Sequence, residues 1–81
     1  MKNAKFTTND HGEIIITVPV NENDKMDVFD NFNKIDKKMS LLGYEETHRF
    51  IKNGNFISIL NHVNNETACK FLKKLNIKQV N

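Results

Sequence analysis

The chain has 81 residues and a formal net charge of +2, from 12 basic and 10 acidic residues. This length has room for one domain, and the charge is small for a dedicated nucleic-acid-binding protein. No apolar run approaches the roughly 18 residues of a membrane-spanning helix, and one cysteine cannot build a disulfide framework or a cysteine-based zinc site. The first residues also lack the apolar stretch of a signal peptide, so we expect a reduced, cytoplasmic domain without membrane contact.

Asparagine, lysine and isoleucine dominate the composition, with 13, 11 and 8 residues respectively. All three amino acids have AT-rich codons, so the skew indicates a low-GC source, such as a bacterium, a phage or another mobile element. At 38% apolar residues the chain can form one core, but a small one. We therefore expect modest stability, which association with a partner could increase.

Residues 1–12 are polar and are expected to form either a flexible N-terminal segment or a short edge strand. Residues 13–81 are expected to form a single α+β domain. The turn signal Asn-Asp-His-Gly over residues 9–12 would allow a strand that begins at Phe6 to form a hairpin with the strand that follows.

A buried strand is predicted over residues 13–20, because its consecutive β-branched residues favour a pleated backbone. The even-numbered apolar residues share one face of this strand, and Ile15 and Thr17 share the other. Pro19 has no backbone N–H to donate, so pairing on its side of the strand should end there.

The clearest helix is predicted over residues 21–42, where apolar residues recur at intervals of four and three residues. Its buried stripe comprises Val28, Phe32, Ile35, Met39 and Leu42, with Phe29 beside it. Asn21 or Asn23 is expected to cap the N-terminus, and the acidic first half and basic second half suit the helix dipole. Gly43 is expected to end the helix by adopting a positive φ.

A hairpin is predicted from residues 45–52 and 55–62, because Asn53-Gly54 between them suits a type I′ turn. A two-residue turn fixes the register and thereby divides the side chains between two faces. One face holds Tyr44, His48, Phe50, Ile57, Ile59 and Val63. We expect this face to cover the core, because it carries more apolar bulk. The other face holds Thr47, Arg49, Ile51, Phe56, Ser58 and Leu60.

A second helix is predicted over residues 64–75, with Asn64 or Asn65 as its cap. Its buried stripe comprises Ala68, Phe71, Leu72 and Leu75. Residues 77–80 suit a short final strand, although the sequence leaves open whether it forms. The order β-α-β-β-α-β is that of ferredoxin-like folds. We therefore expect a two-layer α+β sandwich, an antiparallel sheet with both helices on one face and an optional extra N-terminal strand.

No group of residues in the sequence points to catalysis. His11 lies in a turn, and the predicted register puts His48 and His62 on opposite faces, where they cannot share a metal. Cys69 lies at the flank of the second helical stripe and is interpreted as a half-buried structural thiol. The acidic residues over 22–30 are explained by the helix dipole. We expect no enzymatic activity, no metal and no cofactor.

The face expected to lie outside the sandwich is the first candidate for a functional surface. It would present the apolar residues of the hairpin together with Ile15 and Thr17, and uncovered apolar surface is typical of an interface. The predicted protein-interface residues are Arg49, Ile51, Phe56, Ser58 and Leu60. The hypothesis is a small interaction module, such as an inhibitor or accessory protein of a phage or mobile element. Its partner would be a host protein or a second copy of the chain.

The second candidate function is binding of RNA or single-stranded DNA. Phe56 could stack on a base on the sheet face while Arg49 contacts the backbone. The basic residues assigned to this alternative are Lys52, Lys70, Lys73, Lys74 and Lys78. A nucleic acid is the second choice, because only one aromatic ring would be available for stacking.

Overall fold

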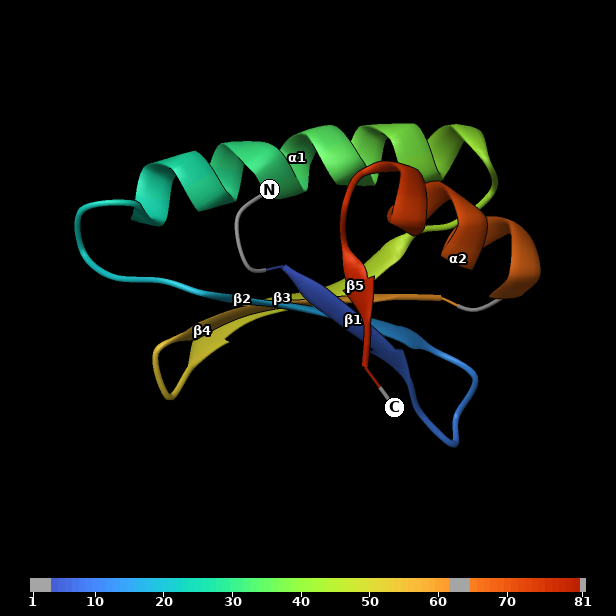
Figure 1. Ribbon diagram of the computed structural model, residues 1–81, viewed down its shortest axis with the longest axis horizontal. Helices are drawn as coiled ribbons and strands as arrows, with labels where there is room; N and C mark the ends of the chain where they lie inside the picture. Colours follow the sequence, from blue (N-terminus) through green and yellow to red (C-terminus); the bar gives the residue numbers. More distant parts are fainter. Residues whose placement is uncertain (1–3, 62–64, 81) are drawn as a thin grey trace.

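The computed structural model describes residues 4–61 and 65–80, which contain two helices and five strands. In chain order these are β1 (Lys5–Thr8), β2 (Ile14–Pro19), α1 (Lys25–Leu41), β3 (Glu46–Lys52), β4 (Asn55–Leu60), α2 (Asn65–Lys74) and β5 (Lys78–Gln79). The strands form one sheet, and both helices lie on the same side of it (Figure 1). The protein is therefore a two-layer α+β sandwich with one face of the sheet uncovered by helices. Neither helix within the described ranges is long and apolar enough to cross a membrane.

The optional N-terminal strand is present as β1, and it forms a hairpin with β2. The Asn9 side chain holds the turn, because its Oδ1 accepts hydrogen bonds from the N–H groups of His11 at 3.0 Å and Glu13 at 2.9 Å. Gly12 adopts the positive φ of 73° that this turn signal predicts. Phe6 on β1 is buried in the core.

The strand order is β3-β4-β2-β1-β5, and it differs from the ferredoxin-like order expected from the sequence. The hairpin places β1 directly beside β2, so β5 pairs with β1 instead of β2. This pairing is parallel, and the sheet is mixed rather than antiparallel throughout. β1 consequently lies inside the sheet and is not an edge strand. The edges are β5, with two residues, and β3, with seven.

α1 begins at Lys25, later than predicted, with Asp24 as the residue at its N-cap. Asp24 makes no side-chain capping hydrogen bond to the helix. Instead the Asn21 Oδ1 accepts from the N–H groups of Asn23 at 2.8 Å and Asp24 at 3.1 Å, which orders the turn before the helix. Asn21 thus satisfies backbone donors as expected of it, but one turn too early to be the helix cap.

The buried face of α1 comprises Val28, Phe32, Ile35 and Met39, as the spacing predicts. Leu42 is 45% exposed, because the chain has already left the helix at that residue. Gly43 has a φ of +91°, and its N–H donates to the Ser40 carbonyl while the N–H of Tyr44 donates to the Met39 carbonyl. This pattern is a Schellman motif, and it carries the buried Tyr44 back over the last turn.

The β3–β4 hairpin has the predicted register, but its faces are reversed. Asn53 and Gly54 have positive φ values of 54° and 74°, as a type I′ turn requires, and Phe50 lies opposite Ile57. The face expected to lie outside is the face that packs under the helices, because Phe56, Ser58 and Leu60 are all at least 96% buried. The assignment of these three residues to an outer face is therefore wrong. A bulge between Glu46 and His48 ends the regular register.

α2 buries Ala68 and Leu72, while Phe71 and Leu75 pack more loosely against the core. Asn76 has a φ of 62°, and the N–H of Ile77 donates to the Leu72 carbonyl, so α2 ends in a second Schellman motif. This turn leads directly into β5. The predicted cap residue Asn64, with His62 and Val63, lies outside the described residues.

Candidate protein-interaction surface

The edge of the sheet formed by β3 carries a groove beneath the N-terminal half of α1. The groove has a volume of about 300 Å³ and is lined by Lys25, Met26, Phe29, Arg49, Phe50, Ile51 and Phe56. We call it the β3-edge groove. Three of the five predicted interface residues line it, namely Arg49, Ile51 and Phe56, whereas Ser58 and Leu60 lie in the interior.

Arg49 forms the polar floor of the groove and is held from three sides. Its Nε donates to both carboxylate oxygens of Glu46 at 2.9 Å, and its Nη1 donates to the Asn33 Oδ1 at 2.7 Å. The guanidinium carbon also lies 5.0 Å from the centre of the Phe29 ring. Ser58 donates to the same Glu46 carboxylate. The charge of Arg49 is therefore compensated within the protein, and Arg49 is a rigid support more than an open anion receptor.

This network explains how a polar Ser58 and a charged pair fit beneath a helix. The side chains of Arg49 and Glu46 are each only 16% exposed, and each is hydrogen-bonded. Buried polar groups are tolerated where their donors and acceptors are satisfied. The sequence predicts Arg49 on the outer face because the opposite face of the hairpin carries more apolar bulk. It does not identify Glu46 as the partner of Arg49 across the bulge.

Large apolar side chains are exposed around the groove on both sides of β3. Met26 is 70% exposed, Phe29 41% and Ile51 45% on the helix side, and Phe50 is 40% exposed on the other side. The ring of Phe29 is also fixed edge-on against Phe56, with centroids 6.1 Å apart. Contiguous exposed apolar surface of this kind is typical of binding sites. The sequence placed Phe29 beside the buried stripe and Phe50 in the core, and it gave no signal for Met26.

The open face of the sheet continues this apolar surface. Ile15 lies beside Ile59, and Thr17 beside Ile57, whose other neighbour is Phe50. The isoleucines are partly exposed, so a ribbon of apolar side chains crosses β2 and β4 and reaches the edge at Phe50. Ile15 and Thr17 thus lie on the open face as predicted, but beside the hairpin residues that were expected in the core.

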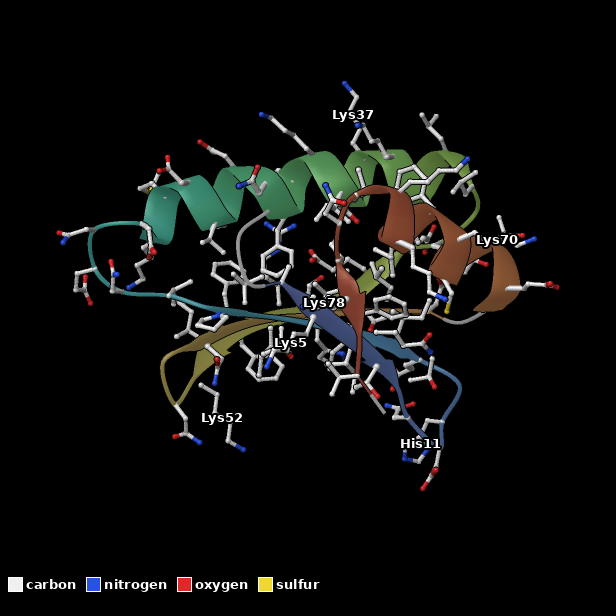
Figure 2. The ribbon with its side chains drawn as sticks, in the orientation of Figure 1. Lys5, His11, Lys37, Lys52, Lys70 and Lys78 are labelled. Atoms are coloured by element: carbon white, nitrogen blue, oxygen red, sulfur yellow. The ribbon has the colours of Figure 1, made fainter. Side chains whose placement is uncertain are left out.

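The lysines assigned to nucleic-acid binding do not form one patch. Lys52 lies at the end of the β3–β4 hairpin, and Lys70 lies on α2 at the opposite end of the molecule (Figure 2). Lys73 and Lys74 follow on α2. The Nζ atom of Lys70 lies 3.9 Å from the Oε1 atom of Glu66. Lys78 lies on β5 beside Lys5 of β1. Lys73 and Lys78 line one shallow depression, and Lys70 and Lys74 line another on α2, whereas Lys52 lies apart at the hairpin end.

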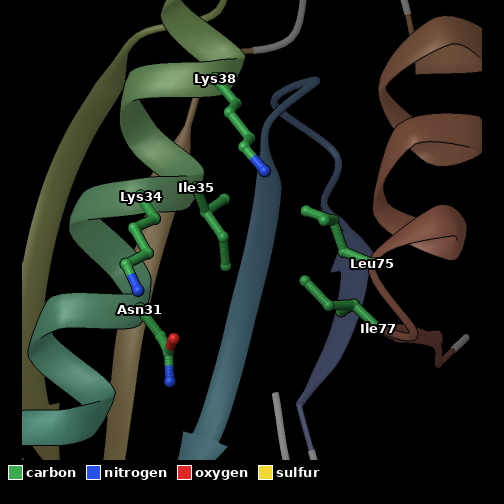
Figure 3. A pocket seen from close by; sticks show the side chains of 6 residues that line it. All are labelled: Asn31, Lys34, Ile35, Lys38, Leu75 and Ile77. Atoms are coloured by element: carbon green, nitrogen blue, oxygen red, sulfur yellow. The ribbon is translucent and has the colours of Figure 1, made fainter.

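A second, smaller depression lies between α1 and the chain that follows α2. Its floor is made by Ile35, Leu75 and Ile77, and Asn31, Lys34 and Lys38 stand at its rim (Figure 3). Its volume is about 130 Å³. The sequence did not single out this site, because Ile35 reads as an ordinary core residue of the helix.

The remaining candidates for chemistry lie apart from one another. His11 and His48 are exposed, in the β1–β2 turn and on β3 respectively, and Cys69 is half-buried on α2. Burial raises the pKa of the Cys69 thiol above its ordinary value, and the charge of Lys73 opposes this effect. Within residues 4–61 and 65–80, no three His, Cys, Asp or Glu side chains are grouped as a metal ion would require.

Comparison of the chain with protein-family models, with curated proteins and with solved structures finds no match. The geometry of the chain is therefore the basis of the proposal that follows.

Proposed function

We propose that the protein is a non-enzymatic protein-interaction module that binds an extended segment of a partner along the outer edge of β3. The observation that supports this function is the gathering of Met26, Phe29, Phe50 and Ile51 on both sides of one uncovered strand edge. In strand addition, backbone hydrogen bonds supply affinity, and pockets for alternate side chains supply specificity. The β3-edge groove offers a pocket on the helix side, and Phe50 offers a contact surface on the other side.

The fixed floor of the groove favours this function over nonspecific apolar contact. Arg49 is held by Glu46 and Asn33, and the ring of Phe29 contacts both Arg49 and Phe56. A surface that is ordered before binding loses less conformational entropy when the partner arrives. The size and composition of the chain suit an accessory protein or inhibitor of a phage or other mobile element, with a host protein or a second copy as its partner.

Affinity capture from lysate of the source cells tests this function, with wild-type protein, Ile51→Asp and Leu41→Asp compared side by side. Leu41 is 83% exposed at the end of α1, so its variant controls for the added charge away from the groove. We expect wild type and Leu41→Asp to retain the same proteins, and Ile51→Asp to lose them. Retention that is equal for all three variants would contradict the proposed surface.

The same capture experiment decides between a protein and a nucleic acid. Retention by the proposed surface is expected to survive nuclease treatment, because backbone pairing and apolar contacts need no nucleic acid. Retention that nuclease abolishes, with a steep loss as salt is raised, would support binding of RNA or single-stranded DNA through the lysines instead.

A further inference from the structure

The backbone groups of β3 that are available for pairing can be identified from the neighbouring strands. The N–H of Val20 donates to the Gly54 carbonyl at 2.9 Å, which continues the β2–β4 register. Hydrogen-bonded and non-hydrogen-bonded pairs alternate in an antiparallel ladder, so the even-numbered residues of β4 bond toward β2 and the odd-numbered ones toward β3. Phe50, which lies opposite Ile57, therefore bonds inward. Its neighbours Arg49 and Ile51 direct their N–H and C=O groups outward.

Within the described residues, no strand pairs with this outer side of β3. We propose that the segment that binds there is β3 of a second copy of this chain, antiparallel about a two-fold axis at Phe50. This inference rests on the proposed function and names the partner of the same surface. In this register Arg49 of each copy exchanges two backbone hydrogen bonds with Ile51 of the other, and the two Phe50 side chains meet on the open face.

The other two-fold registers are less favourable for reasons of charge and backbone geometry. Side chains opposite each other must lie on the same face, so the axis has to pass through a residue and not between two. An axis at Arg49 would place the two guanidinium groups opposite each other. Each is already held by its own Glu46, so neither would gain a partner from the other copy. An axis at Ile51 would place Arg49 opposite Asn53, whose φ of 54° belongs to the turn and not to a strand. Of these three axes, the one at Phe50 pairs the backbone groups of both Arg49 and Ile51 within the strand and opposes each guanidinium group to an apolar side chain.

The same symmetry brings the two copies of α1 into contact. Arg49 and Phe56 both touch Phe29, so α1 lies over the β3–β4 pair. Neighbouring strands are about 4.8 Å apart, which puts the axes of the two α1 helices roughly 10 Å from each other, near the distance at which helices pack. The exposed side chains of Met26 and Phe29 lie on this side of α1 and would be covered in both copies.

The charges on this side of α1 are complementary across the axis. Lys25, Phe29 and Asp36 share the side that faces the edge, because they are spaced by four and seven residues. Among the described residues neither Lys25 nor Asp36 has an ion-pair partner. The two helices run antiparallel, so Lys25 at the start of one helix approaches Asp36 near the end of the other. The two-fold axis creates the same contact a second time, between Asp36 of the first copy and Lys25 of the second.

Disulfide trapping tests the register. In a Cys69→Ser background, the Phe50→Cys protein is expected to form a covalent dimer under mild oxidation, because opposite Cα atoms in a non-hydrogen-bonded pair lie about 4.5 Å apart, within disulfide range. The matched control is His48→Cys, on the same face and strand but opposite Lys52 of the other copy. Equal trapping of both variants, or trapping of neither, would overturn the register.

Light scattering and charge reversal provide a readout that needs no cysteine. Wild-type protein is expected to have about twice the 9.4 kDa mass of one chain, and Lys25→Glu to weaken association severalfold. Lys25→Glu combined with Asp36→Lys should restore it, because the exchanged charges again attract across the axis. Wild-type protein that stays monomeric at its highest attainable concentration would overturn the proposal. If Ile51→Asp still loses a captured partner in that case, the proposed function stands and only the second copy is excluded.

Discussion

Phe56 and Phe50 lie on adjacent strands but face opposite sides of the sheet. The ring centre of Phe56 lies 4.7 Å from that of Phe32 beneath α1, and Phe56 is only 4% exposed. Phe50 is 40% exposed at the edge of the open face. One ring therefore belongs to the core and the other to the surface, although both are flanked by similar residues in the sequence.

We predict opposite outcomes for the same substitution at these two residues. Phe56→Asp should lower the free energy of unfolding by more than about 3 kcal/mol, because it leaves an unpaired carboxylate in the core. That is a large share of the roughly 4–12 kcal/mol expected for a domain of this size. In the single chain, at protein concentrations low enough to prevent association, Phe50→Asp should cost about 1 kcal/mol or less, since this side chain is 40% exposed there. Urea denaturation followed by circular dichroism compares them, and a loss for Phe56→Asp no larger than that for Phe50→Asp would contradict the packing described here.

The reversed faces of the hairpin show what the sequence could and could not predict at single residues. The register followed from Asn53-Gly54, because turn geometry is set locally. The choice of face depended on whether Arg49 would find Glu46 and Asn33, which belong to a bulge and to another element. Apolar bulk alone could not decide, since both faces carry three or more large apolar side chains.

At the scale of the element, both helices end in the same way. Gly43 and Asn76 have φ values of +91° and 62°, and each begins a turn that returns the chain toward the core. The C-terminus of α1 was predicted from Gly43, because left-handed backbone selects Gly or Asn. The same role was not predicted for Asn76. The start of α1 was not predicted, because three residues before Asp24 favour a polar turn over the first helical turn.

We predict that Gly43→Ala lowers the free energy of unfolding by about 1 kcal/mol, because a Cβ atom is disfavoured in left-handed backbone. The space around Gly43 is open, with nothing within 4 Å of where a Cβ would lie, so the cost arises from the backbone and not from a clash. Gly43→Asn is the matched variant, since Asn adopts this conformation more readily. Thermal denaturation of both should rank Asn above Ala, and equal loss for the two would point to a clash instead.

At the scale of the whole molecule, the position of β1 separates the observed sheet from the expected one. The strands, helices and turns predicted over residues 13–81 suit a ferredoxin-like order. Such local patterns, however, do not determine which strand pairs with each edge of β2. β1 occupies the edge of β2 that β5 would have in a ferredoxin-like sheet, since the four residues of β1 are joined to β2 by a short turn and pair with it. β5 then extends the sheet at β1, and β3 remains as the long edge.

The proposed pairing of β3 with a second copy would couple stability to protein concentration. A domain of this size buries a limited apolar surface on folding, and in the proposed dimer the buried β3 edge would add stability that depends on protein concentration. We predict that the Tm of wild-type protein rises with concentration, by roughly 4–8 °C for each kcal/mol gained. The Tm of Ile51→Asp should stay constant over the same range, because the added carboxylate opposes pairing at the edge but lies outside the core. Calorimetry over a dilution series measures both, and a concentration-independent wild-type Tm would show that the β3 edge adds nothing to the stability of the fold.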